Sequence, residues 1–204
     1  MSSTYHISSY CRVKNGRIIL NQKEVFADTS ATDFSVFIKN AYKTLDVSYS
    51  KFFKMDQLSK LGFLAADLIL SDVGISPEEP ENIALVMSNK ASSLDTDRKH
   101  QDSINSAESY YPSPAIFVYT LPNILMGEIS IKHKLFTENS FFIFEAFNPE
   151  HLFTYASILL ETSKADKVLC GWVDVDNNSY DALLYMVTKE GTTPHTIKNI
   201  TDLY

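Results

Sequence analysis

Three short apolar segments, set among stretches with helical periodicity, constrain the fold of this 204-residue chain more than any other feature. They are residues 82–87, 140–144 and 167–173, and each is apolar almost throughout. Such segments are typical of strands buried on both faces of a parallel or mixed sheet. Residues 55–72 and 148–162 instead carry apolar side chains at helical spacing. Strands that alternate with helices predict an α/β fold in which a mixed sheet has helices on both faces.

The remaining expected elements follow from spacing and turn residues. Asn15-Gly16 is a hairpin signal because both residues tolerate positive φ, and Asn148-Pro149-Glu150 suits the start of a helix. Further strands are expected at 6–13, 17–20 and 182–187, a short extended piece at 115–119, and helices at 31–45, 97–106 and 121–134. The polar segment after Gly191 has no interpretable pattern. With no linker or repeat between these elements, residues 1–204 are expected to form a single domain.

The acidic balance of the chain argues against a nucleic-acid partner. The formal net charge is −7, whereas phosphate binding requires clustered Lys and Arg side chains. Lys51, Lys54 and Lys60 lie close together in the sequence, although Asp46 and Asp56 interrupt them. We interpret these lysines as a solvated face, with a weak patch for an anionic partner as the alternative.

The two cysteines, Cys11 and Cys170, are far apart and lie in apolar, strand-like segments. They have neither CxxC nor metal-ligand spacing, so we expect free, reduced thiols and no metal site. The chain has no Walker loop and no GxGxxG, HExxH or GxSxG motif, and its six glycines argue against a phosphate cradle. No cofactor is therefore expected.

The N-terminal residues do not have the charged start and apolar run of a signal peptide. Charged residues or proline interrupt the richest apolar stretches at Asp67, Pro122 and Glu128, well short of the ~20 residues of a membrane-spanning helix. We therefore expect a cytoplasmic protein with no membrane partner.

Three sets of residues, in order along the chain, resemble the N-terminal half of a β-ketoacyl-acyl-carrier-protein synthase. They are Lys54-Met55-Asp56 before a long apolar helix, Ser113-Pro114-Ala115-Ile116-Phe117 followed by Thr120-Leu121-Pro122-Asn123 and Gly127, and Lys164-Ala165-Asp166-Lys167-Val168-Leu169-Cys170-Gly171. The resemblance extends over residues 5–184. It implies half of a thiolase fold, with a five-stranded mixed sheet and helices on both faces. Within the family, the chain is most similar to the short, divergent ketosynthase-like proteins of aryl-polyene and flexirubin-type pathways.

The resemblance also implies where a nucleophilic cysteine would lie. Counting back from Ala165-Asp166 without gaps places that position at Ala146, between Glu145 and Phe147. The family needs a thiolate there, at the N-terminus of the helix that starts near Asn148. None of these three residues can form a thioester. Glu145 has two interpretations: it imitates an anionic or acylated state of the missing cysteine, or it is simply a polar or helix-capping residue.

The catalytic histidines of the family belong to its second half, which has no counterpart in this sequence. His195 lies in a Thr-Pro-His-Thr segment that matches neither histidine motif. The other histidines are scattered and are expected at the surface or at helix caps: His6, His100, His133 and His151. The resemblance therefore implies that this chain alone does not catalyse condensation.

The leading hypothesis is a non-condensing subunit or accessory protein of fatty-acid or polyketide-type synthesis. Halves of the thiolase fold pair through the strand before the nucleophile helix, which predicts a dimer interface at Ser140, Phe141, Phe142, Ile143 and Phe144. The partner would be a second copy or a cysteine-bearing ketosynthase. Two alternatives stay open: an active acyltransferase or 3-oxoacyl synthase with a relocated site, and an acyl-carrier-protein-binding module without chemistry.

Overall fold

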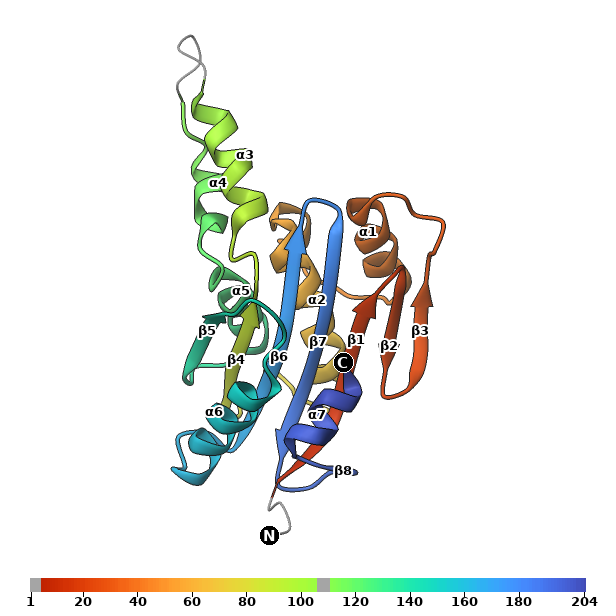
Figure 1. Ribbon diagram of the computed structural model, residues 1–204, viewed down its shortest axis with the longest axis vertical. Coiled ribbons are helices and arrows are strands. Elements are labelled where there is room, and N and C mark those ends of the chain that lie inside the picture. Colours follow the sequence, from red (N-terminus) through yellow and green to blue (C-terminus); the bar gives the residue numbers. More distant parts are fainter. Residues whose placement is uncertain (1–4, 106–110) are drawn as a thin grey trace.

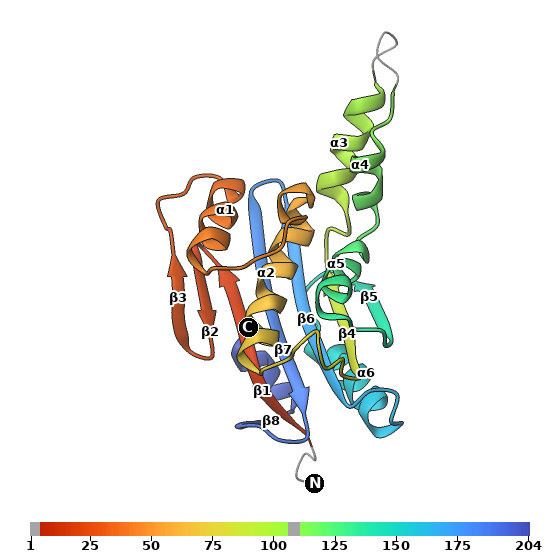
Figure 2. The same ribbon diagram turned by 180° about the vertical axis from the view of Figure 1, so that it is seen from behind.

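The computed structural model describes residues 5–105 and 111–204 as one mixed sheet with helices on both faces (Figures 1 and 2). The strand order is β3-β2-β1-β7-β6-β4-β5, and the short β8 pairs with β1. The strands are β1 His6–Lys14, β2 Arg17–Leu20, β3 Lys23–Ala27, β4 Ile83–Asn89, β5 Asn139–Ile143, β6 Lys167–Asp176, β7 Ser179–Thr188 and β8 Thr193–Pro194.

The α-helices are α1 Phe34–Thr44, α2 Gln57–Asp72, α3 Leu94–Ile104, α4 Pro114–Phe117, α5 Ile124–His133, α6 Pro149–Glu161 and α7 Ile197–Leu203. Two 3₁₀ turns, η1 Phe52–Lys54 and η2 Val118–Thr120, precede α2 and α5. Helices α3 and α4 lie side by side and project beyond the end of the sheet (Figure 1).

The sheet is parallel at one side and antiparallel at the other. Strand β4 pairs in parallel with both β5 and β6, whereas β7 is antiparallel to β6 and to β1. Because parallel neighbours need a crossover, helices α5 and α6 connect these strands over the two faces. All seven residues of β4 are buried, as expected for a central strand covered on both sides.

The sheet has one apolar core on each of its two faces. The larger core lies under α1, α2 and α5, and the smaller one lies under α6 and α7. Helix α2 is buried around most of its circumference, because it packs on the sheet and is flanked by α1 and α5 (Figure 2). Asp56 caps its start by accepting a hydrogen bond from the Ser59 N–H at 2.8 Å.

Three features differ from the expectation drawn from the sequence. The sheet has eight strands instead of five, because the hairpin at Asn15-Gly16 continues into β2 and β3 and because β8 adds a short pair. Residues 115–119 are helical rather than extended, since Ser113 caps the Ile116 N–H and Pro114 occupies the first turn. The segment after Gly191 forms β8 and α7.

Among the described residues, no single helix has the length and apolar composition needed to cross a bilayer. The segments Pro114–Thr120 and Ile124–His133 meet that test only when they are counted together across a 100° bend.

Candidate functional site

The turn between β5 and α6 contains the residues at which the family resemblance places a nucleophile. Asn148 caps α6 by accepting a hydrogen bond from the His151 N–H at 3.0 Å, and Pro149 and Glu150 occupy its first turn. Glu145 and Ala146 are exposed just before this cap, and Phe147 is half-buried. The turn therefore has the helix N-terminus that would stabilise a thiolate, without a thiol.

An open hollow of about 490 Å³ lies beside this turn. It is lined by Lys90, Glu145, Ala146, Phe147, Pro149, Trp172, Asp174, Ser179, Asp181, Thr201 and Tyr204. Neither a cysteine nor a histidine is among these residues, and the carboxylates outnumber the one lysine. Within the described residues Glu145 makes no hydrogen bond or ion pair, so Asn148 and not Glu145 caps α6. Nothing in this hollow can form an acyl thioester.

Tyr204 closes one side of the hollow. Its ring stacks on the Phe147 ring at a centroid distance of 4.3 Å. The Arg12 guanidinium lies over the Tyr204 ring, 4.5 Å from the ring centroid. The Tyr204 hydroxyl donates to Asp181 Oδ2 at 2.8 Å. Burial, together with the Asp181 carboxylate, raises the pKa of Tyr204 to about 12. The hydroxyl is therefore a neutral hydrogen-bond donor. Through the stack of Tyr204 on Phe147, the end of α7 packs against the turn that precedes α6.

Asp181 is the polar centre of this contact. It forms ion pairs with Arg12 and with Lys14, the latter at 3.1 Å. Burial alone would raise the pKa of Asp181, but the hydrogen bond and charge of Arg12 outweigh it, so this pKa lies below its usual value. No local sequence pattern reveals this group, because Arg12, Asp181 and Tyr204 belong to three distant segments. The β6–β7 pairing places Asp174 opposite Asp181.

Neither cysteine can serve this hollow. Cys11 in β1 and Cys170 in β6 are free and fully buried. Burial raises the pKa of each thiol to about 12, so both are protonated at neutral pH.

Two histidines are buried, and for one of them, His133, this differs from expectation. His195 is buried against the rings of Phe153 and Tyr185, and burial lowers its pKa to about 4. His133, expected at a surface or a cap, is buried, and its Nε2 lies 2.9 Å from Asp67 Oδ1. Apolar spacing in α5 could not reveal this, because the partner carboxylate lies on α2. Over the described ranges, no three His, Cys, Asp or Glu side chains converge as metal ligands.

The predicted interface strand lies at the edge of the sheet. Strand β5 pairs with β4 alone, so its other backbone edge has no partner strand within the described chain. Phe141 packs against the core under α2 and α5, and Phe142 packs against the core under α6. Ser140 hydrogen-bonds Tyr155 at 2.9 Å, Ile143 is 51% exposed, and Phe144 follows the strand. An unpaired strand edge with apolar side chains on both faces is open to pairing with another strand, so the interface at residues 140–144 stays a prediction.

The three lysines singled out in the sequence do not act as one group. Lys51 and Lys54 are exposed at η1, whereas Lys60 is half-buried on α2. Lys54 and Lys60 line a hollow together with Lys99, and Lys51 lies outside it.

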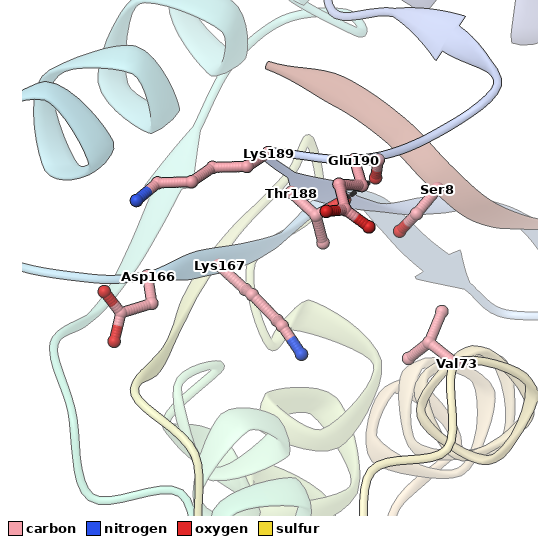
Figure 3. A pocket seen from close by; sticks show the side chains of 7 residues that line it. All are labelled: Ser8, Val73, Asp166, Lys167, Thr188, Lys189 and Glu190. Atoms are coloured by element: carbon pink, nitrogen blue, oxygen red, sulfur yellow. Dashed lines mark hydrogen bonds between the residues drawn. The ribbon is translucent and has the colours of Figure 1, made fainter. Parts of the chain in front are cut away.

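A further hollow lies where β6 begins and β7 ends, and Figure 3 shows the side chains that line it. Its lining combines two lysines with two acidic residues and contains Ser8, Val73, Asp166, Lys167, Thr188, Lys189 and Glu190. Lys167 is already paired with Glu81. With balanced charges and no nucleophile beside a base, this hollow indicates no chemistry.

No protein-family model and no curated protein sequence matches the chain. Solved structures do match its fold. The ishigamide ketosynthase/chain length factor aligns with a TM-score of 0.64 and 15% identity over 90% of this chain. The chain adopts the ketosynthase fold. The family resemblance drawn from the sequence is thereby confirmed at the level of the fold, as half of a thiolase-type structure.

Two other matched structures show what share of each known chain this chain covers. A structure of the ketosynthase ApeO in complex with its chain length factor ApeC, from Xenorhabdus doucetiae, aligns over 100% of this chain and 90% of the matched one, with a TM-score of 0.59 and 13% identity. A β-ketoacyl synthase from Burkholderia phymatum aligns over 93% of this chain with a TM-score of 0.59 and 11% identity. The chain spans 62% of the ishigamide protein and 60% of the Burkholderia enzyme.

Proposed function

We propose that this chain is a non-condensing, ketosynthase-like subunit that pairs with a cysteine-bearing ketosynthase in fatty-acid or polyketide-type synthesis. The observation that carries the proposal is the turn before α6. It retains a capped helix N-terminus and an open hollow, yet it has exposed Ala146 at the position assigned to the nucleophile. A half-fold with this turn can support a partner's structure without performing the condensation.

The chemistry of the two thiols supports the same role. A thioester forms on a thiolate, and Cys11 and Cys170 are both buried with pKa values of about 12. The enolate formed by decarboxylation needs polar donors, and no histidine lines the hollow. Neither this hollow nor the one beside Ser8 is lined by a cysteine or a histidine, which favours the non-condensing role over activity from a relocated site.

One edge of β5 has no partner strand within residues 5–105 and 111–204, and this edge supports the pairing. The unpaired edge carries Phe141 and Phe142 on opposite faces and ends at the half-exposed Ile143. Such an edge tends to aggregate unless another strand covers it. A ketosynthase is the partner proposed over a second copy, because a matched structure of similar chain length comes from a ketosynthase in complex with its chain length factor.

Co-expression with a candidate ketosynthase, followed by native mass spectrometry, tests this pairing. We expect a one-to-one complex, and we expect Ile143→Lys to abolish it by placing a charge on the edge strand. Val36→Lys is the matched control, because Val36 is 48% exposed and lies on α1, away from β5. Circular dichroism melting of both variants reports whether either substitution unfolds the chain.

A chain that stays monomeric beside the ketosynthase at high concentration contradicts the proposal. A homodimer that Ile143→Lys dissociates would retain the β5 interface but remove the assignment of the partner. A complex that tolerates Ile143→Lys but not Val36→Lys would place the interface elsewhere.

Carrier-protein binding is a second part of the proposal. Lys51 and Lys54 are exposed and form no ion pair within the described residues, so they are available to an acidic partner. We expect a carrier protein to bind the complex, with affinity that falls as salt rises. Reversal of Lys51 to Glu should weaken binding, whereas Lys198→Glu on α7 should not, and equal effects of the two reversals would contradict this patch.

A further inference from the structure

The hollow lined by Lys54, Lys60 and Lys99 is separate from the turn before α6. It measures about 250 Å³ and lies between the start of α2, α3 and α4. Its lining combines lysines with apolar and aromatic side chains and contains Ser35, Lys54, Met55, Asp56, Gln57, Lys60, Thr96, Lys99, Ala115, Ile116 and Tyr119. None of these residues lines the hollow beside Ala146.

Lys60 lacks a counter-charge in direct contact. Its side chain is half-buried, and across the described residues it forms no ion pair. Burial lowers the pKa of Lys60, the nearby charge of Asp56 raises it and that of Lys99 lowers it further, with the net shift downward. Holding a partly desolvated ammonium group without a partner is unfavourable, so an anion beside it would be stabilising.

The carboxylates near this hollow are already engaged. Asp56 accepts from the Ser59 N–H at 2.8 Å and from the Thr96 hydroxyl at 2.9 Å. Asp95 forms an ion pair with Lys99 at 2.6 Å. The lining itself contains three lysines and one carboxylate, Asp56, so its charge is positive and suits an anion.

The rest of the lining is apolar or able to hydrogen-bond. Met55, Ala115 and Ile116 provide an apolar wall, and Tyr119 is fixed because its hydroxyl donates to Glu128 at 3.0 Å. The side-chain oxygen of Gln57 is buried without a partner within the described chain. Gln57 lines the hollow, and its amide N–H₂ group is a hydrogen-bond donor that an anion can accept from.

We propose that this hollow binds a small carboxylic acid with an apolar body. The carboxylate contacts the ammonium groups of Lys60 and Lys54 and the amide of Gln57, and the apolar body lies along Met55 and Ile116. The hollow is smaller than the roughly 300–1,000 Å³ of sites for drug-sized ligands, so the acid is short or has a single ring. Inorganic phosphate is disfavoured, because it has no apolar body to contact Met55 and Ile116. This inference does not depend on the proposed function.

Isothermal titration calorimetry of the purified chain with benzoate and with octanoate tests the proposal. We expect at least one of these acids to bind, and we expect inorganic phosphate and octanol to give no binding. Lys60→Gln should weaken the affinity about tenfold, the loss expected for one charge-assisted hydrogen bond. Lys51→Gln is the control, because Lys51 lies outside the hollow and should leave the affinity unchanged.

A second variant fills the hollow instead of removing charge. Ala115 is exposed at the start of α4, so Ala115→Trp should block the hollow and abolish binding with little change in the melting temperature. Absence of binding by either acid at millimolar concentration would overturn the proposal. It would also be overturned by unchanged affinity in Lys60→Gln, by equal losses in Lys60→Gln and Lys51→Gln, or by phosphate binding better than both acids.

Discussion

The reactivity of an introduced thiol at Ala146 should differ from that of both native thiols. Ala146 is exposed beside the α6 N-terminus, whereas Cys11 and Cys170 are fully buried. The helix N-terminus lowers the pKa of a thiol introduced by Ala146→Cys, and the neighbouring Glu145 opposes this effect. We therefore take an ordinary pKa of about 8.5 for the introduced thiol.

The difference in rate follows from the thiolate fractions. At pH 8 about a quarter of the introduced thiol is ionised, compared with about 10⁻⁴ of a thiol whose pKa is about 12. The greater intrinsic nucleophilicity of a more basic thiolate offsets this ratio by a factor of about 40. The net difference is roughly 60-fold, and the local opening needed to reach Cys11 or Cys170 increases it further.

Alkylation with iodoacetamide, followed by intact mass, measures this difference. Because the wild-type chain has two such thiols, we expect Ala146→Cys to gain one adduct at least about 30-fold faster than the wild-type chain gains its first. Both chains in urea, where every thiol is accessible, are the control. Modification of native Cys11 or Cys170 as fast as the introduced thiol would refute the burial argument, and an unreactive introduced thiol would refute the open turn.

Three further predictions concern stability. Gly171→Ala should lower the free energy of unfolding by about 3 kcal/mol or more in urea titrations, because φ is 153° and an added Cβ would lie 1.9 Å from the Leu183 carbonyl oxygen; a change below about 1 kcal/mol would contradict this close approach. The stability contributed by neutral His195 is complete above pH 6.5 and lost as pH falls to about 4, because the unfolded chain takes up the proton first. His195→Phe should flatten that part of the pH–stability curve, and an unchanged slope would contradict the assignment. Tyr204→Ala should cost about 1–2 kcal/mol and Tyr204→Phe less, because phenylalanine retains the stack on Phe147 but not the hydrogen bond to Asp181; equal losses in thermal melts would refute the stacking contribution.

Much of the fold could be predicted from apolar patterning. The structure has α2 at Gln57–Asp72 and α6 at Pro149–Glu161, within two residues of expectation, because each has a strong apolar face and an N-terminal cap. The prediction of an extended piece at 115–119 was wrong, because a run of five apolar residues does not distinguish a strand from a turn of helix. Helix α7 was missed because only Ile200 is buried in it, so no apolar periodicity marks it.

The site could be predicted only in part. The family resemblance and a count from Ala165 assign the nucleophile position to Ala146, and this assignment stays a prediction. The structure has Ala146 in the turn between β5 and α6. The residues that surround it could not be found in this way. Arg12, Asp181 and Tyr204 meet because β1 and β7 are neighbours and α7 folds back over them, which no local pattern reveals.

The central claim is that this chain supports condensation without carrying the acyl group. The most direct measurement is the intact mass of both chains after the complex with a ketosynthase is incubated with acyl- and malonyl-carrier protein. We predict an acyl adduct on the cysteine-bearing partner and no added mass on this chain. An acyl adduct on this chain, or release of CO₂ by this chain in isolation, would contradict the account.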